Sequence, residues 1–158
     1  MILYGSSLSP YVRKVLAFAA EKGIELELRP TGDAPGKPGP EFLAASPTRK
    51  MPALVDGDYR LADSSAIVHY LEALRPEPNL IPTEARARGR TIWFDEYGDT
   101  IVMGCGGKMF FNRVVAPRFL GSRAMLQWPT RPNATSFRRS STIWRQWFQR
   151  AASWSRTG

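Results

Sequence analysis

Three serines, Ser6, Ser7 and Ser9, stand just before a run with helical spacing that begins at Pro10. Proline suits the first turn of a helix, because the N–H that it lacks would have no partner there. A hydroxyl at this place can cap the helix, or it can donate a hydrogen bond to an anion at the positive end of the helix. The segment therefore poses a choice between a hydroxyl that takes part in chemistry and one that only turns the chain.

A second set of polar residues flanks a predicted β-hairpin. Lys50 precedes the dipeptide Met51-Pro52, and Asp63 and Ser64 precede the next helical run. Asp63 or Ser64 is a suitable N-cap for that helix, and a solvated side chain is the simplest interpretation of Lys50. On their own, these residues are compatible with purely structural roles.

The elements that must position these residues are indicated by local patterns. Apolar residues recur at helical spacing after Pro10 until Gly23, and residues 24–28 alternate between apolar and acidic. Asp56-Gly57 is a typical hairpin turn. The patterns predict strands at residues 1–4, 24–28, 53–55 and 59–61, and helices at residues 10–22, 41–45 and from 64 onward. The predicted order is β-α-β-α-β-β-α, followed by helices that begin near residues 84 and 109.

Composition narrows the class of protein. The chain has 158 residues and one cysteine, which excludes an internal disulfide and favours a reducing compartment. It has no apolar run long enough to cross a bilayer and no N-terminal secretion signal. We therefore expect a soluble, cytoplasmic protein without a membrane partner.

Three features, taken together and in this order, resemble a glutathione transferase. They are a strand followed by "SPYVRKVLAFAAEKGIELEL", the Met51-Pro52 dipeptide before a hairpin, and "ADSSAIVHYL" at the start of the next helix. The resemblance covers residues 1–121. It implies an α/β thioredoxin-like N-terminal domain that binds glutathione, followed by an all-α glutathione-transferase C-terminal domain, truncated in this chain.

The resemblance also gives the serines a role. In serine-type, bacterial-like members a hydroxyl near the N-terminus of the first helix meets the sulfur of glutathione, which points to Ser9 as the catalytic residue. Ser6 and Ser7 are the alternatives, and helix capping alone remains the structural interpretation. The hydroxyl is a hydrogen-bond donor here, and with the helix dipole it favours the thiolate over the thiol.

The other site residues follow from the same resemblance. Pro52 corresponds to the cis-proline of the family, and the backbone of Met51 then pairs with the tripeptide. Lys50 matches a position near the glycyl carboxylate. Ser64 binds the γ-glutamyl carboxylate, and Asp63 faces the ammonium. No metal and no cofactor is implied, and glutathione is a co-substrate.

The domain limits come from the resemblance and from a break in composition. We expect a glutathione-binding domain at 1–76, a linker at 77–83 and the start of the helical domain at 84–121. Residues 122–158 carry seven arginines, four tryptophans and no acidic residue. We interpret this tail as disordered and as the product of a frameshift near Gly121, because suitable codons read out of frame can encode a transferase-like helical sequence. A divergent surface tail is the alternative.

The function implied is detoxifying transfer of the glutathione thiolate to a small electrophile, with the activity of the truncated chain in doubt. The intact family form is expected to be a homodimer. A non-catalytic glutathione-binding or interaction module is the alternative, and a basic tail that binds nucleic acid is a further, less favoured one. Four aromatic side chains can line an electrophile pocket or pack in a helical core; they are Trp93, Tyr97, Phe110 and Phe111.

Overall fold

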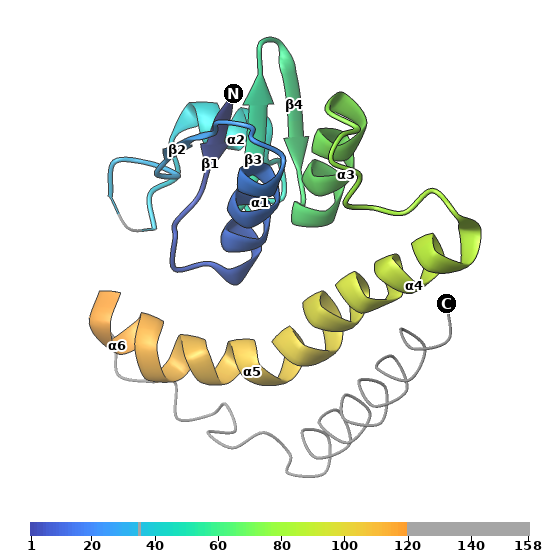
Figure 1. The fold of residues 1–158 in the computed structure, drawn as a ribbon. Helices are drawn as coiled ribbons and strands as arrows, with labels where there is room; N and C mark the ends of the chain where they lie inside the picture. Colours follow the sequence, from blue (N-terminus) through green and yellow to red (C-terminus); the bar gives the residue numbers. More distant parts are fainter. Residues whose placement is uncertain (35, 120–158) are drawn as a thin grey trace. The chain divides into compact units, whose positions relative to one another are not determined.

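The computed structural model describes residues 1–34 and 36–119 of the chain. Its N-terminal part has the predicted β-α-β-α-β-β-α order (Figure 1). The elements are β1 (Ile2–Tyr4), α1 (Pro10–Glu21), β2 (Glu27–Arg29), α2 (Pro40–Ala45), β3 (Ala53–Asp56), β4 (Tyr59–Ala62) and α3 (Ser64–Leu74). The fold-class prediction is therefore confirmed for this part of the chain.

The four strands form one mixed sheet in the order β2-β1-β3-β4. β1 runs parallel to β2 and antiparallel to β3, and β3 and β4 form the predicted hairpin. Gly57 has a φ of +58° in the hairpin turn, a conformation that glycine adopts without a steric penalty. This mixed sheet with helices on its faces is a thioredoxin-like arrangement.

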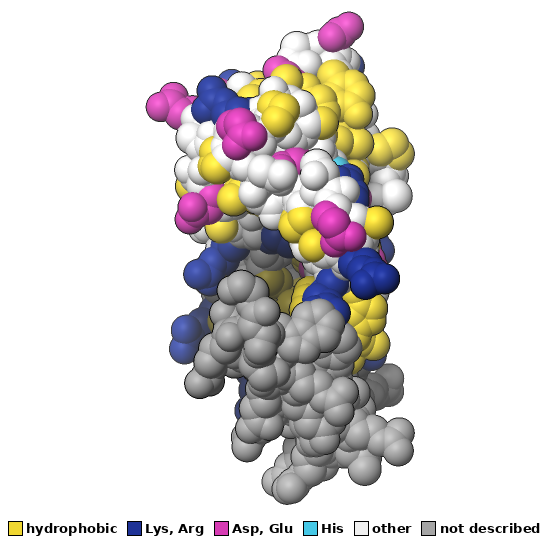
Figure 2. All heavy atoms as spheres, turned by 45° about the vertical axis from the view of Figure 1, so that its right-hand side comes forward, with side chains coloured by type: hydrophobic (Ala, Val, Ile, Leu, Met, Phe, Trp, Pro, Cys, Tyr) yellow, Lys and Arg dark blue, Asp and Glu magenta, His cyan; other side chains and the backbone are white. Residues whose placement is uncertain are grey.

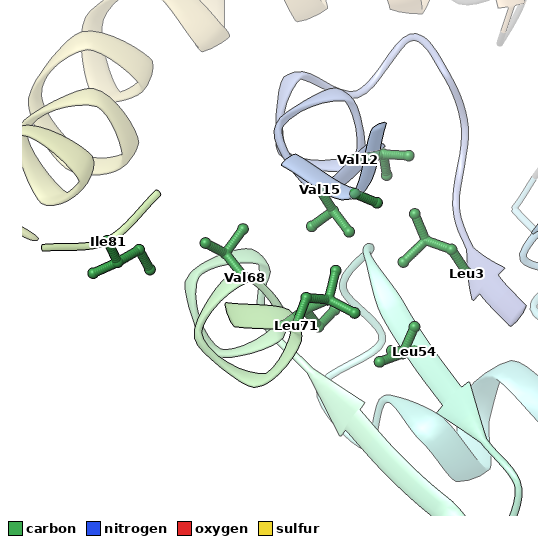
Figure 3. Packing of buried hydrophobic residues seen from close by; sticks show 9 residues of the cluster. Leu3, Val12, Val15, Leu54, Val68, Leu71 and Ile81 are labelled. Atoms are coloured by element: carbon green, nitrogen blue, oxygen red, sulfur yellow. The ribbon is translucent and has the colours of Figure 1, made fainter. Parts of the chain in front are cut away.

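The core lies between the sheet and the helices α1 and α3 (Figure 3). Leu3 and Leu54 project from the sheet toward Val12 and Val15 of α1 and Leu71 of α3, and all five are fully buried. Successive side chains of a strand point to opposite faces of the sheet. The neighbouring residues of β1 and β3 therefore pack in a second cluster on the other face. That cluster joins the sheet to α2 and contains Tyr4, Phe42, Ala45 and Ala53.

The strand β2 differs from its prediction. It covers Glu27–Arg29 rather than residues 24–28, because the chain first closes the end of α1. Gly23 has a φ of +63°, and the N–H of Ile24 donates to the carbonyl of Ala19 at 2.8 Å. Ile24 then packs against the core from a loop. The apolar and acidic alternation thus reflects a packed loop followed by a short edge strand.

The described residues after α3 are helical from α4 (Ala85–Glu96) to Phe119. Two π-helical segments, η1 (Tyr97–Val102) and η2 (Phe111–Val115), alternate with α5 (Met103–Phe110) and α6 (Ala116–Phe119). Residues 109–119 are helical as predicted, but no new helix begins at residue 109, since the helical run already includes "GCGG" within α5. A glycine inside a helix costs only about 1 kcal/mol, so it need not end one.

Contacts divide the chain into two units, with the boundary between Thr91 and Ile92. The predicted domain limits at residues 76, 83 and 121 remain predictions, and the tail at 122–158 lies outside the described residues. Within the described ranges, no helix combines the length and the apolar character needed to cross a membrane.

Candidate functional site

Ser9 is the residue that caps α1. Its backbone is extended (φ −74°, ψ 124°), and its hydroxyl accepts a hydrogen bond from the N–H of Val12 at a long 3.5 Å. A hydroxyl that accepts one bond still has its own proton to donate. Ser9 is also half-buried at the positive end of the helix, so its O–H can serve an anion placed there.

Ser6 and Ser7 have different surroundings. Ser6 Oγ accepts from the N–H of Leu8 at 3.3 Å, and the carbonyl of Ser6 accepts from the N–H of Ser9 at 2.9 Å. Ser6 therefore shapes the turn that leads into α1. Ser7 is exposed in the middle of that turn. Of the three serines, only Ser9 is the cap residue of the helix.

The approach of this turn to α1 requires Gly5. A Cβ atom at Gly5 would meet Cγ2 of Val12 at 2.5 Å, closer than real carbon atoms approach. The N–H of Gly5 also donates to the carbonyl of Arg29 at 2.8 Å. The glycine thus lets the loop after β1 pass directly over the first turn of α1.

A further hydroxyl near the end of β1, that of Tyr4, is already engaged. Tyr4 is buried in the cluster under α2, and its O–H donates to Oε2 of Glu41 at 2.5 Å. This hydrogen bond, together with burial, raises the pKa of the phenol above its ordinary value. Tyr4 is therefore held neutral on the α2 side of the sheet, and it does not compete with Ser9 as a donor.

The segment before β3 has the geometry that the resemblance implied. The peptide bond between Met51 and Pro52 is cis. Pro52 is buried and Lys50 is exposed. The half-buried Met51 packs against both hydrophobic clusters. The ammonium of Lys50 is therefore accessible, while the backbone that follows it is anchored.

Asp63 caps α3, and its Oδ1 makes both cap bonds. It accepts from the N–H of Ser65 at 2.9 Å and from the N–H of Ala66 at 3.1 Å. Its φ is +86°, which is sparsely populated for a residue other than glycine and persists only where the surroundings determine it. Ser64, the first residue of α3, is buried. The capping interpretation of Asp63 is therefore correct, and it leaves room for a second role.

The register of the sheet gathers the three segments. Tyr4 pairs with Ala53, and Ala53 pairs with Ala62, so the three residues form one row across β1, β3 and β4. Neighbours in such a row are about 4.5–5.5 Å apart between Cα atoms. The serine loop leaves β1 at this row, the cis-proline enters β3 there, and the cap of α3 follows β4 there. All the predicted site residues therefore lie at one end of the sheet.

Two polar residues at this end were missed by the sequence analysis. Nζ of Lys14 on α1 donates to Oγ of Ser65 at 2.9 Å, at the N-terminus of α3. No local pattern signals this contact, because its partners are 51 residues apart. The other is Ser46, fully buried at the end of α2; its place just after a helix and before Pro47 was a signal that went unused.

The described residues contain no group of three or more His, Cys, Asp or Glu side chains that could hold a metal ion. The groups that the candidate site brings together are a hydroxyl at one helix N-terminus, a cap at a second helix N-terminus, an exposed lysine and the backbone beside a cis-proline. Such a set can bind an extended molecule with charges at both ends and stabilise an anion between them.

Comparison with known proteins gives a consistent result. The family described as "Glutathione S-transferase, N-terminal domain" matches residues 3–79. Glutathione S-transferase 3 of Zea mays is 38% identical over 96 residues, which cover 59% of this chain and 43% of that protein. Glutathione S-transferase theta-3 of Mus musculus is 32% identical over 121 residues, which cover 75% of this chain and 50% of that protein.

A solved structure supports the same relationship. The crystal structure of human glutathione transferase theta-2, in complex with glutathione, matches with a TM-score of 0.68 and 29% identity, covering 94% of this chain and 58% of that one. The chain spans about half the length of the curated relatives it matches.

Proposed function

The chain belongs to the glutathione S-transferase family, and on that premise we propose that it binds glutathione and promotes the transfer of its thiolate to a small electrophile. The observation that carries the proposal is the single row Tyr4–Ala53–Ala62. It brings a helix-capping hydroxyl, a cis-proline edge and a second helix N-terminus to one end of the sheet. A tripeptide with a thiol in its middle and charges at both ends matches that arrangement.

In this proposal, Ser9 donates a hydrogen bond to the sulfur of glutathione. Lowering a thiol pKa by about two units takes roughly 2.7 kcal/mol, which a charge-assisted hydrogen bond and the dipole of α1 can supply. The cap geometry of Ser9 supports it over Ser6, whose hydroxyl and carbonyl both serve the turn. Ser7 is exposed and does not cap α1.

The two ends of the tripeptide are held by different elements. The backbone of Met51 pairs with the central residue as an added strand would, and Lys50 meets the glycyl carboxylate. At the opposite end, Ser64 binds the γ-glutamyl carboxylate and Asp63 faces the ammonium. The two cap bonds of Asp63 support this role, because they hold its carboxylate in place.

The test is a titration of the full chain with glutathione, with Ser9→Ala and Ser7→Ala as matched variants. We expect calorimetry to show binding in all three. The ultraviolet absorbance of the thiolate, followed against pH, should show that Ser9→Ala raises the pKa of the bound thiol by about one to two units, while Ser7→Ala leaves it unchanged. A folded sample that gives no heat with millimolar glutathione would disprove binding, and an unchanged thiol pKa in Ser9→Ala would disprove the role of Ser9.

A second candidate is a module that binds glutathione without turnover. One observation favours it: several large apolar side chains of the described helices after Thr91 are exposed, among them Trp93, Phe110 and Phe111. Retention on immobilised glutathione, combined with no conjugation of a chlorinated aromatic acceptor, would identify this alternative.

Family membership also supports proposals about location and assembly. We expect the protein in the cytoplasm and, for the intact family form, a homodimer. Light scattering on the purified full chain tests the second point directly.

A further inference from the structure

Ser46 is a serine without access to solvent. It ends α2, where its N–H donates to the carbonyl of Phe42 at 2.8 Å, and its exposed fraction is 0%. Serine is usually found at the surface, and a buried hydroxyl needs hydrogen-bond partners. The partners of this one therefore indicate what it does.

The hydroxyl of Ser46 satisfies both backbone polar groups of Lys50. Oγ donates to the carbonyl of Lys50 at 2.8 Å and accepts from the N–H of Lys50 at 3.1 Å. The carbonyl of Ser46 also accepts from the N–H of Arg49 at 2.9 Å. Residues 46–50 are thus closed into a ring by one side chain and one backbone bond.

The ring contains an unusual backbone conformation. Arg49 has a φ of +59°, which residues other than glycine rarely adopt without support from their surroundings. The bonds on either side of it, from Ser46 to Arg49 and to Lys50, supply that support. The direction in which the chain leaves the ring is therefore set by Ser46.

We propose that Ser46 is a positioning residue for the glycyl end of glutathione. This inference rests on the proposed function, since it is Lys50 that meets the glycyl carboxylate. Without the Ser46 hydroxyl, the backbone of Lys50 loses two hydrogen bonds, and its exposed side chain is no longer presented from a closed ring. The γ-glutamyl end, held by α3, does not depend on this ring.

The experiment compares two ligands on the full chain by calorimetry: glutathione, and γ-glutamylcysteine, which lacks the glycine. We expect Ser46→Ala to weaken glutathione binding roughly tenfold, the size of effect that follows the loss of positioning hydrogen bonds. It should change γ-glutamylcysteine binding by less than about twofold, which is below the effect of one lost hydrogen bond. Thr83→Ala removes an exposed hydroxyl outside this loop and should leave both affinities unchanged; Thr48 is not suitable as a control, because its Oγ1 lies 3.4 Å from Oγ of Ser46.

Two further variants test whether Ser46 acts through Lys50 and provide a substitute if Ser46→Ala does not fold. In a variant that already carries Lys50→Met, adding Ser46→Ala should not change the ratio of the glutathione and γ-glutamylcysteine affinities any further. The reason is that the effects of residues that act as one unit are not additive. Thermal melts establish folding. If the alanine variant does not fold, Ser46→Cys keeps nearly the same volume with weaker hydrogen bonding and should show the same preferential loss for glutathione.

The outcomes separate this inference from the proposed function. If the unmodified chain binds neither ligand, the proposed function fails. If it binds both, and Ser46→Ala weakens both equally or neither, then Ser46 has only a structural role or none at this end, and the positioning inference is overturned.

Discussion

The two units of the chain differ in how they use their apolar residues. The unit from Met1 to Thr91 places fully buried side chains from the sheet, α1 and α3 in one cluster. In the described residues from Ile92 onward, Tyr97 and Ala116 are the buried hydrophobic residues, while side chains as large as Trp93 and Phe111 are 43% and 46% exposed. Figure 2 shows hydrophobic side chains at the described surface beside acidic and basic ones.

The difference follows from topology. Strands and helices that cross one another along a β-α-β path contact partners far away in the sequence, so a short chain can bury a core. A single helical run contacts mainly its own neighbouring turns and needs other helices to cover its apolar side chains. The residues of the proposed glutathione site all belong to the first kind of region.

The largest expected effect comes from Lys22 at the end of α1, whose ammonium forms an ion pair with Glu72 of α3 and hydrogen bonds to the segment after α3. Lys22 is 2% exposed, pairs with Glu72, and donates to the carbonyls of Arg75 at 2.8 Å and Pro78 at 2.6 Å. Lys22→Met leaves the largely buried carboxylate of Glu72 without its charged partner, and breaking such a pair typically costs about 3–5 kcal/mol. Urea unfolding of the variant measures the loss.

The matched control is the double variant Lys22→Met/Glu72→Met, which removes both charges and should recover much of the free energy of unfolding. A loss of less than about 1 kcal/mol in the single variant, the worth of an exposed ion pair, would show that the first unit does not extend its packing into the segment after α3.

A core truncation should come next. Leu71→Ala in α3 removes a fully buried side chain, and such changes cost about 2–5 kcal/mol. Leu74, three residues further along the same helix, is 51% exposed, so Leu74→Ala should cost under about 0.5 kcal/mol. Equal losses in the two variants would contradict the assigned core.

A smaller effect is expected at the cap of α3. Asp63→Ala removes the acceptor of two backbone hydrogen bonds and should cost about 0.5–2 kcal/mol. Asp63→Asn keeps a cap acceptor and tolerates a positive φ, so its thermal midpoint should stay close to that of the unmodified chain. Weaker glutathione binding by Asp63→Asn, at unchanged stability, would separate the proposed ligand role from the cap.

The pH dependence of the free energy of unfolding of the first unit provides a further test, with a smaller expected effect. Burial alone would raise the pKa of Glu72, but the hydrogen bonds from Lys22 and from the N–H groups of Ile81 and Leu80 outweigh it and lower the pKa below the ordinary 4.5. A lowered pKa contributes stability above pH 4.5 that is lost as the pH falls through the folded-state value. Unfolding curves between neutral and acidic pH should show this loss, and it should be smaller in Lys22→Met/Glu72→Met, where only other carboxylates such as Glu27 and Glu84 still contribute.

The smallest effect is expected in the second unit. Phe111→Ala truncates a side chain that is 46% exposed, so the free energy of unfolding should change by less than about 0.5 kcal/mol. Leu71→Ala is the natural reference, because both changes remove a large apolar group. A cost above about 2 kcal/mol, typical of a buried site, would mean that the two units bury their apolar residues alike.

Much of the first unit was predictable because its signals are local. Pro10 after Ser9 marks a helix start, and Asp56-Gly57 marks a hairpin. The signals failed where packing decided the outcome: Ile24 lies in a packed loop rather than a strand, and the glycines of α5 continue a helix. Lys14 and Lys22 were missed because their partners are about 50 residues away along the chain.

The amino-acid sequence by itself determined the order of the elements and the segments that carry Ser9, Lys50, Met51-Pro52 and Asp63-Ser64, because propensities, caps and turns act between near neighbours. Only the tertiary structure decided that these segments meet. The pairing of Tyr4, Ala53 and Ala62 in one row depends on strand register, and a shift of one residue would turn every side chain of a strand to the opposite face.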